Sequence, residues 1–293
     1  MPKTLWADLG FQGPQIMAIL NTTPDSFSDG GSFFQKNALQ LDAVLRAAEA
    51  AISEGASILD VGGESTRPGA ASITVQEELD RVLPVVERIL RAFDVAVSVD
   101  TSTPDVMREA AVAGVKLIND VRALSRDGAL EAALETGLPV CLMHMQGSPQ
   151  TMQTNPSYDD PVSEVLEWLV ERARQCLAAG FSQGQILLDP GFGFGKTLVH
   201  NQALFRALPQ FVASGFPILV GVSRKTMIGE ITGRPVNQRD VGSAVAAAMA
   251  AASGAAIVRV HDVVSTRDAL RVASALGDPG LLECWGSHAF QVK

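Results

Sequence analysis

Eight short apolar runs recur along this chain, and nearly every one ends at a polar residue or a polar cluster. Helix-like stretches separate them, and such an alternation is typical of a parallel sheet whose strands are continuous Val, Ile and Leu runs. Eight units are the number that closes a (β/α)8 barrel, in which the C-terminal ends of all strands meet at one mouth. The runs are residues 16–20, 57–63, 95–99, 116–118, 139–143, 186–188, 217–222 and 255–258.

The predicted fold is therefore an α/β, single-domain (β/α)8 TIM barrel. A length of 293 residues suits one such domain, which typically needs about 250 residues. We expect an N-terminal extension (1–15), the barrel (16–280) and a C-terminal tail (281–293), with no linker between domains. A doubly wound sheet is the alternative, but the first predicted βα turn, NTTPDS, lacks the GxGxxG pattern of that fold.

Two connections are longer than the 2–6 residues of an ordinary βα loop. They are residues 21–36 and 62–74, after the first and second predicted strands, and their Gly, Ser and Pro content predicts mobile loops. Helices are expected near residues 37–54, 75–93, 104–113, 127–136, 160–179, 200–213, 239–253 and 263–275.

Charge and hydropathy exclude several classes of partner. The net charge of −9 argues against binding of nucleic acid or an anionic membrane. The longest apolar stretch, residues 243–258, is interrupted at Gly254 and falls short of the roughly 20 residues of a membrane span. Three cysteines without a CxxC pair, and a start that lacks the apolar region of a secretory signal, lead us to expect a cytoplasmic protein without a metal–thiolate site.

Acidic and amide side chains follow three different predicted strands. Asp100, Asn119 and Asp189 should all lie at the mouth, where carboxylates can accept paired N–H groups from a flat heterocycle and Asn can both donate and accept. Each of them could instead cap the next helix, for which Asp and Asn are well suited. Three such residues on separate strands favour ligand contact.

Basic residues also stand at strand ends. Arg259 and His261 are two apart on one strand and point the same way, so they could hold a planar ring or an anion. Lys225 and Ser223 follow another strand, and Thr66 with Arg67 lies on the second long loop. The alternative for Arg259 is a simple ion pair at the barrel rim.

The Gly-rich segment 190–197, PGFGFGKT, approaches the phosphate-binding pattern GxxxxGK[ST], but Pro190 replaces its first Gly. We expect a flexible loop that lets Phe192 or Phe194 cover an aromatic ligand. The histidines have no partner at the spacing of zinc ligands. Asn21 could instead be one oxygen ligand of a Mg²⁺ ion that arrives with a diphosphate, or it could cap a helix.

Eight segments closely resemble, in order, the motifs of the dihydropteroate synthase family. The resemblance covers residues 14–275, with no departure at a motif position. The segments are NTTPDSFSDGG (21–31), DVGGESTRPGA (60–70), SVDTS (98–102), IND (118–120), LMHMQG (142–147), DPGFGFGK (189–196), GVSRK (221–225) and RVHD (259–262).

The resemblance implies a (β/α)8 barrel that joins 6-hydroxymethyl-7,8-dihydropterin diphosphate to 4-aminobenzoate and releases diphosphate. It also implies a Mg²⁺ requirement, a homodimer and inhibition by sulfonamides. By the resemblance, Arg67, Asp100, Asp189, Lys225 and His261 are catalytic. The implied substrate contacts are Thr66, Arg67, Asp100, Asn119, Met143, Asp189, Phe194, Ser223, Lys225, Arg259 and His261, with Asn21 on the metal.

Within that set, the acidic and amide residues would hold the pterin edge, with Arg259 stacked beside the ring. Arg67 and His261 would bind the diphosphate, and Ser223 would receive the aminobenzoate. The expected mechanism is dissociation to a dihydropterin cation that the arylamine then attacks. Two rivals are a methyltransferase that moves a methyl group from methyltetrahydrofolate to a corrinoid, and a non-catalytic pterin-binding paralogue. The cationic set argues against the first, and the presence of Arg67 and Asn21 argues against the second.

Overall fold

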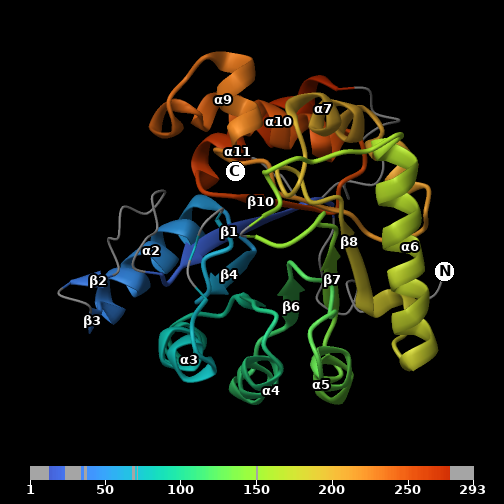
Figure 1. The fold of residues 1–293 in the computed structure, drawn as a ribbon. Coiled ribbons are helices and arrows are strands. Elements are labelled where there is room, and N and C mark those ends of the chain that lie inside the picture. Colours follow the sequence, from blue (N-terminus) through green and yellow to red (C-terminus); the bar gives the residue numbers. More distant parts are fainter. Residues whose placement is uncertain are drawn as a thin grey trace.

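Eight parallel strands form one sheet that curls into a barrel (Figure 1), in the order β8-β7-β6-β5-β4-β1-β10-β9. The computed structural model describes residues 13–23, 34–35, 38–67, 70, 72–149 and 151–277. A bridge between Leu188 and Ile218 joins the two outer strands, and the Leu188 N–H donates to the Pro217 carbonyl at 3.0 Å. The barrel strands are β1 (Gln15–Asn21), β4 (Ile58–Gly62), β5 (Ala96–Asp100), β6 (Leu117–Asp120), β7 (Val140–Met143), β8 (Ile186–Asp189), β9 (Leu219–Val220) and β10 (Ile257–Val260). The predicted (β/α)8 fold is confirmed.

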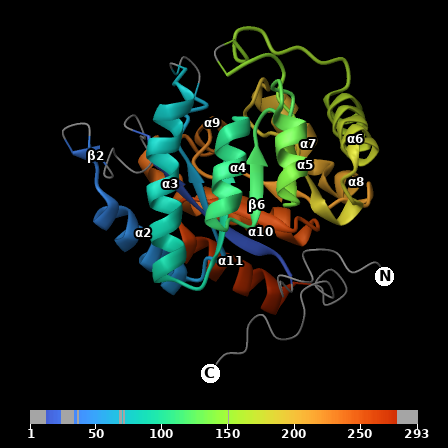
Figure 2. The same ribbon diagram turned by 90° about the horizontal axis from the view of Figure 1, so that it is seen from below.

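Helices surround the barrel, and Figure 2 shows α2 to α5 as successive rods around one side. Local sequence starts several of them: Thr74 and Glu77 form a capping box before α3, and Asp160 and Asp262 cap α6 and α11. The helices are α2 (Leu41–Glu54), α3 (Val75–Ala92), α4 (Pro104–Ala113), α5 (Ala129–Thr136), α6 (Pro161–Ala179), α7 (Leu198–Arg206), α8 (Leu208–Val212), α9 (Thr226–Thr232), α10 (Asp240–Ala252) and α11 (Val263–Leu276). In the part of the chain that the structure describes, no helix combines the length and apolar character of a membrane span.

The structure corrects two of the expected helices and adds one. The first begins at Leu41 rather than residue 37, because a short antiparallel pair, β2 (Phe34–Gln35) with β3 (Ala38–Leu39), precedes it. The stretch 200–213 is divided into α7 and α8, and Pro209 stands in the first turn of the second piece, where its missing N–H is tolerated. The short helix α9 was not expected.

Several predictions fall outside the described residues. Most of the first long loop, most of the N-terminal extension and all of the C-terminal tail lie there. The second long loop is described at residues 62–67, 70 and 72–74. The domain boundaries and the mobility of both loops therefore stay predictions.

The buried apolar side chains form two layers. The larger lies between the sheet and the helices, where strand residues such as Leu59, Val99 and Leu188 pack against helix residues such as Val86 and Leu169. The smaller fills the bottom of the barrel and consists of Met17, Ile58, Leu117, Cys141, Leu187, Leu219 and Ile257. This inner plug fills the interior of the barrel at the N-terminal ends of the strands, so in the described residues a ligand site is expected at their C-terminal ends.

Candidate active site

A layer of polar side chains lies directly above the inner plug. Strand residues alternate between the two faces of a sheet, so the residue two positions after each plug residue also points into the barrel. This rule places Asp60 after Ile58, Asn119 after Leu117, Asp189 after Leu187 and Arg259 after Ile257. Parallel register sets Asp60 beside Ser98, Asp100 beside Asn119 and Met143 beside Asp189. The predicted acidic and amide residues are thus brought together at one level of the barrel.

Arg259 lies between two carboxylates of this layer. Its Nε donates to Asp60 Oδ2 at 2.6 Å, and its Nη2 donates to Asp100 Oδ2 at 2.8 Å. Burial alone would lower the pKa of Arg259, but the Asp60 and Asp100 carboxylates raise it above its usual range. The guanidinium therefore stays charged, and two of its donors hold its plane in a fixed orientation. The ion pair that was the alternative for Arg259 is present, but it lies inside the barrel, and Arg259 also lines the cavity.

The same Asp60 oxygen orients Asn119. The Asn119 Nδ2 donates to Asp60 Oδ2 at 3.1 Å, which leaves the amide oxygen of Asn119 as the group available to a ligand. The other oxygen of Asp60, Oδ1, is buried without a partner, as is the Ser98 hydroxyl beside it. Asp60 is fully buried and was not predicted as a site residue. The available signal was a carboxylate within an apolar strand, because Asp is almost never fully buried unless it is paired.

Burial raises the pKa of both Asp100 and Asp189. Arg259 opposes the rise at Asp100, and Lys225 opposes it at Asp189. The Asp189 Oδ1 also accepts from the Gly191 N–H at 2.7 Å, so this carboxylate is fixed by its own loop. Both acidic groups stand in a poorly solvated environment, where a cationic or N–H-rich ligand gains more than it would in water.

Lys225 reaches the same region from the end of β9. Its ammonium donates to the Phe192 carbonyl and lies 4.5 Å from the centre of the Phe194 ring. Burial lowers the pKa of Lys225 to about 8, although Asp189 opposes this shift. The preceding Arg224 has a positive φ of 58° and is held by Asp240 at 2.6 Å. This turn brings Lys225 back to the mouth of the barrel.

His261 and Ser223 are coupled at the rim. The Ser223 Oγ accepts from the His261 backbone N–H at 3.1 Å and lies 3.0 Å from His261 Nδ1. Because the hydroxyl can donate to Nδ1, the imidazole proton is assigned to Nε2, which becomes a donor for an anion. Burial and the nearby Arg224 and Arg259 lower the pKa of His261 to about 3, so the imidazole is neutral near pH 7.

One cavity of about 920 Å³ opens at this mouth and unites most of the predicted site. Asn119, Met143 and Asp189 are not among its lining residues; they are 4%, 3% and 6% exposed and belong to the same inward-facing layer of strand residues as Arg259, which does line it. The predicted residues that line the cavity are Asn21, Thr66, Arg67, Asp100, Phe194, Ser223, Lys225, Arg259 and His261.

The Gly-rich segment 190–197 does not form a phosphate-binding loop. The ammonium of Lys196 is buried and donates to the carbonyls of Gly191 and Phe194, both at 3.0 Å, and lies 3.0 Å from His144 Nδ1. The donors of Lys196 are used by this segment and by His144, which follows β7. Phe192 is fully buried against Phe205, so only Phe194 of the two aromatic candidates faces the cavity.

Three comparisons with known proteins show the family to which this chain belongs. The family model described as "Pterin binding enzyme" matches residues 17–261. The dihydropteroate synthase of Escherichia coli K12 is 54% identical over 267 residues, which cover 91% of this chain and 93% of the relative, and that of Haemophilus influenzae is 52% identical over 262 residues, covering 89% and 94%.

Solved structures show the same likeness in three dimensions. A Yersinia pestis dihydropteroate synthase with a sulfonamide drug complex superposes with a TM-score of 0.86 at 51% identity, covering 92% of this chain and 95% of the other. A Xanthomonas albilineans dihydropteroate synthase with 4-aminobenzoic acid gives a TM-score of 0.83 at 47% identity, with 90% and 93% covered. The chain therefore belongs to the dihydropteroate synthase family of pterin-binding transferases.

Proposed function

We propose that this chain joins 6-hydroxymethyl-7,8-dihydropterin diphosphate to 4-aminobenzoate, forming 7,8-dihydropteroate and releasing diphosphate. The observation that carries the proposal is the single cavity in which Arg259, paired with two carboxylates, lies at the floor and Arg67 and His261 lie at the rim. Such a cavity offers an acidic, hydrogen-bonding end to a heterocycle and a basic end to its anion. No observation favours the methyltransferase or the non-catalytic alternative.

The acidic end suits the pterin ring. Asp189 and Asp100 can accept from ring and amino N–H groups, and the Asn119 amide oxygen accepts from one more. Arg259 is held flat by its two ion pairs, so its guanidinium face can stack on the ring. Lys225 adds a donor at the ring edge, and Met143 lies beside Asp189 as an apolar contact.

The basic end suits the leaving group. In the reaction, the bond between the pterin methylene carbon and the diphosphate oxygen breaks, and the oxygen keeps the electron pair. The charge of Arg67 and the Nε2–H of His261 stabilise the negative charge that develops there, with Thr66 nearby. The methylene cation that remains is delocalised into the ring, where the Asp100 and Asp189 carboxylates stabilise it. The amine of 4-aminobenzoate then forms the new C–N bond and loses a proton, so no protein nucleophile is needed.

We also propose that Mg²⁺ accompanies the diphosphate. The described residues contain no cluster of three or more His, Cys, Asp or Glu side chains that could hold a resident metal. Asn21 lines the cavity as one neutral oxygen donor, which fits an ion that takes most of its ligands from phosphate and water. When bound, the ion supplies charge neutralisation at the leaving group.

Phe194 and Ser223 are proposed for the aminobenzoate. Phe194 lines the cavity beside Lys225 and offers an aromatic face to a benzene ring. Ser223 lines the cavity too, where it also orients His261. The 4-aminobenzoic acid in the Xanthomonas relative and the sulfonamide in the Yersinia relative support a subsite of this kind.

We further propose a cytoplasmic homodimer. Support for the reducing compartment comes from Cys141 and Cys176, which are buried and unpaired in the described structure. Support for the dimer comes from exposed apolar side chains on the neighbouring helices α10 and α11, including Val241, Val245 and Met249 at helical spacing.

The decisive test measures diphosphate release from the purified chain. With the pterin diphosphate, 4-aminobenzoate and Mg²⁺, we expect release together with dihydropteroate. We expect competition by a sulfonamide against 4-aminobenzoate and loss of turnover in excess chelator, restored by added Mg²⁺. Absence of dihydropteroate would refute the synthase, whereas turnover in excess chelator would refute only the role of the metal.

A further inference from the structure

A strained turn follows strand β6. Ala123 and Leu124 both have positive φ angles, 49° and 59°, although neither is glycine, and both are buried. Side chains rarely adopt this left-handed conformation, because Cβ crowds the backbone. Two such residues in succession persist only where the surroundings hold them in place.

The turn is held from two sides. The Asp120 carboxylate accepts from the Arg122 N–H at 2.8 Å, from the Leu124 N–H at 2.7 Å and from the Ser102 hydroxyl. From helix α6, Arg172 donates its Nε to the Ala123 carbonyl at 2.6 Å and its Nη2 to the Leu124 carbonyl at 2.5 Å. The backbone N–H and carbonyl groups of the turn are therefore held by two charged side chains, the buried Asp120 carboxylate and the partly buried Arg172 guanidinium.

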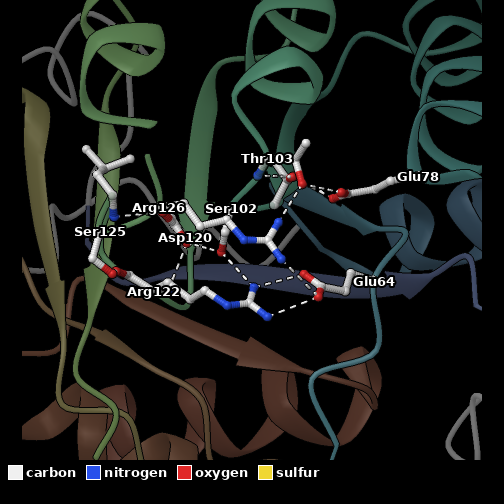
Figure 3. Close-up of polar contacts among 10 residues, drawn as sticks. Glu64, Glu78, Ser102, Thr103, Asp120, Arg122, Ser125 and Arg126 are labelled. Atoms are coloured by element: carbon white, nitrogen blue, oxygen red, sulfur yellow. Dashed lines mark hydrogen bonds and ion pairs between the residues drawn. The ribbon is translucent and has the colours of Figure 1, made fainter. Parts of the chain in front are cut away.

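The turn places Arg122 in an ion pair with Glu64 that is largely shielded from solvent (Figure 3). Arg122 donates Nη1 and Nη2 to the two oxygens of Glu64 at 2.8 and 3.0 Å, and its Nη1 also lies 3.0 Å from Ser102 Oγ. Arg126 approaches the same carboxylate at 3.5 Å. The Glu64 side chain is only 8% exposed, and such two-point pairing fixes geometry as well as charge.

A second carboxylate extends the network to helix α3. Arg126 Nη1 donates to Thr103 Oγ1 at 2.8 Å, and the Thr101 and Thr103 hydroxyls each donate to Glu78 at 2.5 Å. Burial raises the pKa of Glu78, and the nearby Glu64 adds to the rise. Another residue of α3, Arg81, donates to the Gly63 carbonyl at 3.1 Å.

These contacts hold the beginning of the second long loop. Gly63 and Glu64 are held by Arg81 and Arg122, and Thr66 and Arg67, which follow after Ser65, line the cavity. Arg122 and Arg126 already donate to protein oxygens, so they hold the loop rather than bind an anion. The arginine proposed to bind the diphosphate is Arg67, three residues after Glu64.

We propose that Glu64 is a positioning residue, gripped by Arg122 and Arg126 so that Thr66 and Arg67 are set for the departing diphosphate. The inference rests on the proposed function, since it assigns Arg67 to that leaving group. This role accounts for the strained turn beside the mouth, because the backbone conformation at Ala123 and Leu124 directs the Arg122 side chain toward Glu64 at the start of the loop. Binding of the pterin ring itself does not depend on these contacts with Glu64, because the proposed ring contacts lie on β5, β6, β7, β8 and β10 and, for Lys225, after β9.

The test compares Glu64→Gln and Arg122→Gln with a matched control, Arg108→Gln. Arg108 pairs with Glu135 at 2.7 Å between α4 and α5, but both side chains are at least 40% exposed. For Glu64→Gln and Arg122→Gln we expect kcat/KM for the pterin diphosphate to fall about tenfold or more, because a misplaced loop loses transition-state contacts. The Kd for 6-hydroxymethylpterin, which has no diphosphate, should change by less than about twofold.

The double variant should be no worse than the poorer single variant, since both remove one interaction. Arg108→Gln should retain normal kinetics. Equal weakening of both ligands, or normal kinetics in Glu64→Gln, would overturn the proposal. Should Arg122→Gln fail to fold, Glu64→Gln, which keeps the size of the side chain, still decides the question. A wild-type chain that releases no diphosphate would instead refute the proposed synthase activity.

Discussion

At the scale of single residues, the geometry of the site depends on Asp60, a fully buried carboxylate that is not among the lining residues of the cavity. Asp60 accepts from both Arg259 and Asn119 through one oxygen, so it sets the plane of the guanidinium and the direction of the amide together. A buried pair of this kind is not a simple source of stability, because desolvation offsets much of its attraction. Its consequence here is specificity, since the ligand meets one fixed pattern of donors and acceptors.

Asp60→Asn should therefore impair both stability and recognition. Arg259 keeps Asp100 but loses a charged acceptor, which should cost about 1.5–3 kcal/mol in the free energy of unfolding. The affinity for 6-hydroxymethylpterin should fall as well, because the Asn119 amide can then rotate. Urea unfolding and fluorescence titration measure the two effects. The control is Asp268→Asn, which breaks a surface pair with Arg267 at 3.1 Å and should cost at most about 1 kcal/mol. An Asp60→Asn protein with normal pterin affinity would contradict the orienting role.

The protonation of Lys225 leads to a prediction on pH. Its pKa is lowered to about 8 by burial, so its charge is lost as the pH rises through 8, far below the usual range of lysine. Donation to the pterin weakens in that interval, and kcat/KM for the pterin diphosphate should decline on the alkaline side. Lys225→Arg keeps its charge at all accessible pH values, so its decline should move above pH 9, roughly. An alkaline limb that does not move would assign the titration to another group.

At the scale of elements, the segment 190–197 after β8 shows that a glycine-rich motif can serve a purpose other than phosphate binding. Gly191 has a φ of +69°, and a Cβ placed there would lie 1.9 Å from the His144 carbonyl oxygen. The close approach lets Lys196 reach three carbonyls of two neighbouring segments. The glycine-rich segment thus packs closely against His144, donates a hydrogen bond from Gly191 to Asp189, and places Phe194 in the lining of the cavity.

Gly191→Ala should be far more destabilising than a positive φ alone explains. Gly137 has nearly the same φ, +68°, but no atom lies within 4 Å of its Cβ position. Gly137→Ala should cost about 1–2 kcal/mol in the free energy of unfolding, the price of the left-handed backbone. Gly191→Ala should exceed this by at least about 2 kcal/mol, because the loop must move away from His144. Equal losses in the free energy of unfolding for the two variants, measured by urea unfolding, would show that the segment can move away from His144 at little cost.

The elements also show what a sequence can predict. Positions of the strands and most helices follow from local signals, such as apolar runs that end at polar residues and Gly at helix ends. The break between α7 and α8 and the seven-residue α9 were missed, because each piece is too short for a helical period to be recognised. Candidate site residues at the strand ends could be predicted, because the C-terminal ends of all barrel strands lie at the same mouth.

At the scale of the whole molecule, what escaped prediction was pairing between distant segments. Asp60 and Arg259 are 199 residues apart, and Glu64 and Arg122 are 58 apart. Neither pair has a local pattern, since each depends on the register of the closed barrel and on a turn with unusual backbone angles. The sequence therefore predicted most of the residues that line the cavity, but not Asp60, Glu64 and Arg122, which hold them in position.

The surface carries the last prediction, on assembly. Val241, Val245 and Met249 are 76%, 52% and 56% exposed along one face of α10, and the adjacent α11 adds Val272 and Leu276. Exposed apolar side chains on two neighbouring helices are typical of an interaction site, and the same helices of a second copy can cover them about a two-fold axis. Light scattering on a sizing column should give twice the 30.9 kDa mass of the chain. Met249→Lys should shift this mass toward the monomer, whereas Val112→Lys on α4, where the valine is 85% exposed, should leave it unchanged. A monomer in the unaltered chain, or a dimer that survives Lys at both Val245 and Met249, would place the interface elsewhere or remove it. Because the patch lies on the outer helices and the cavity at the strand ends, chemistry at the mouth need not require residues of the partner.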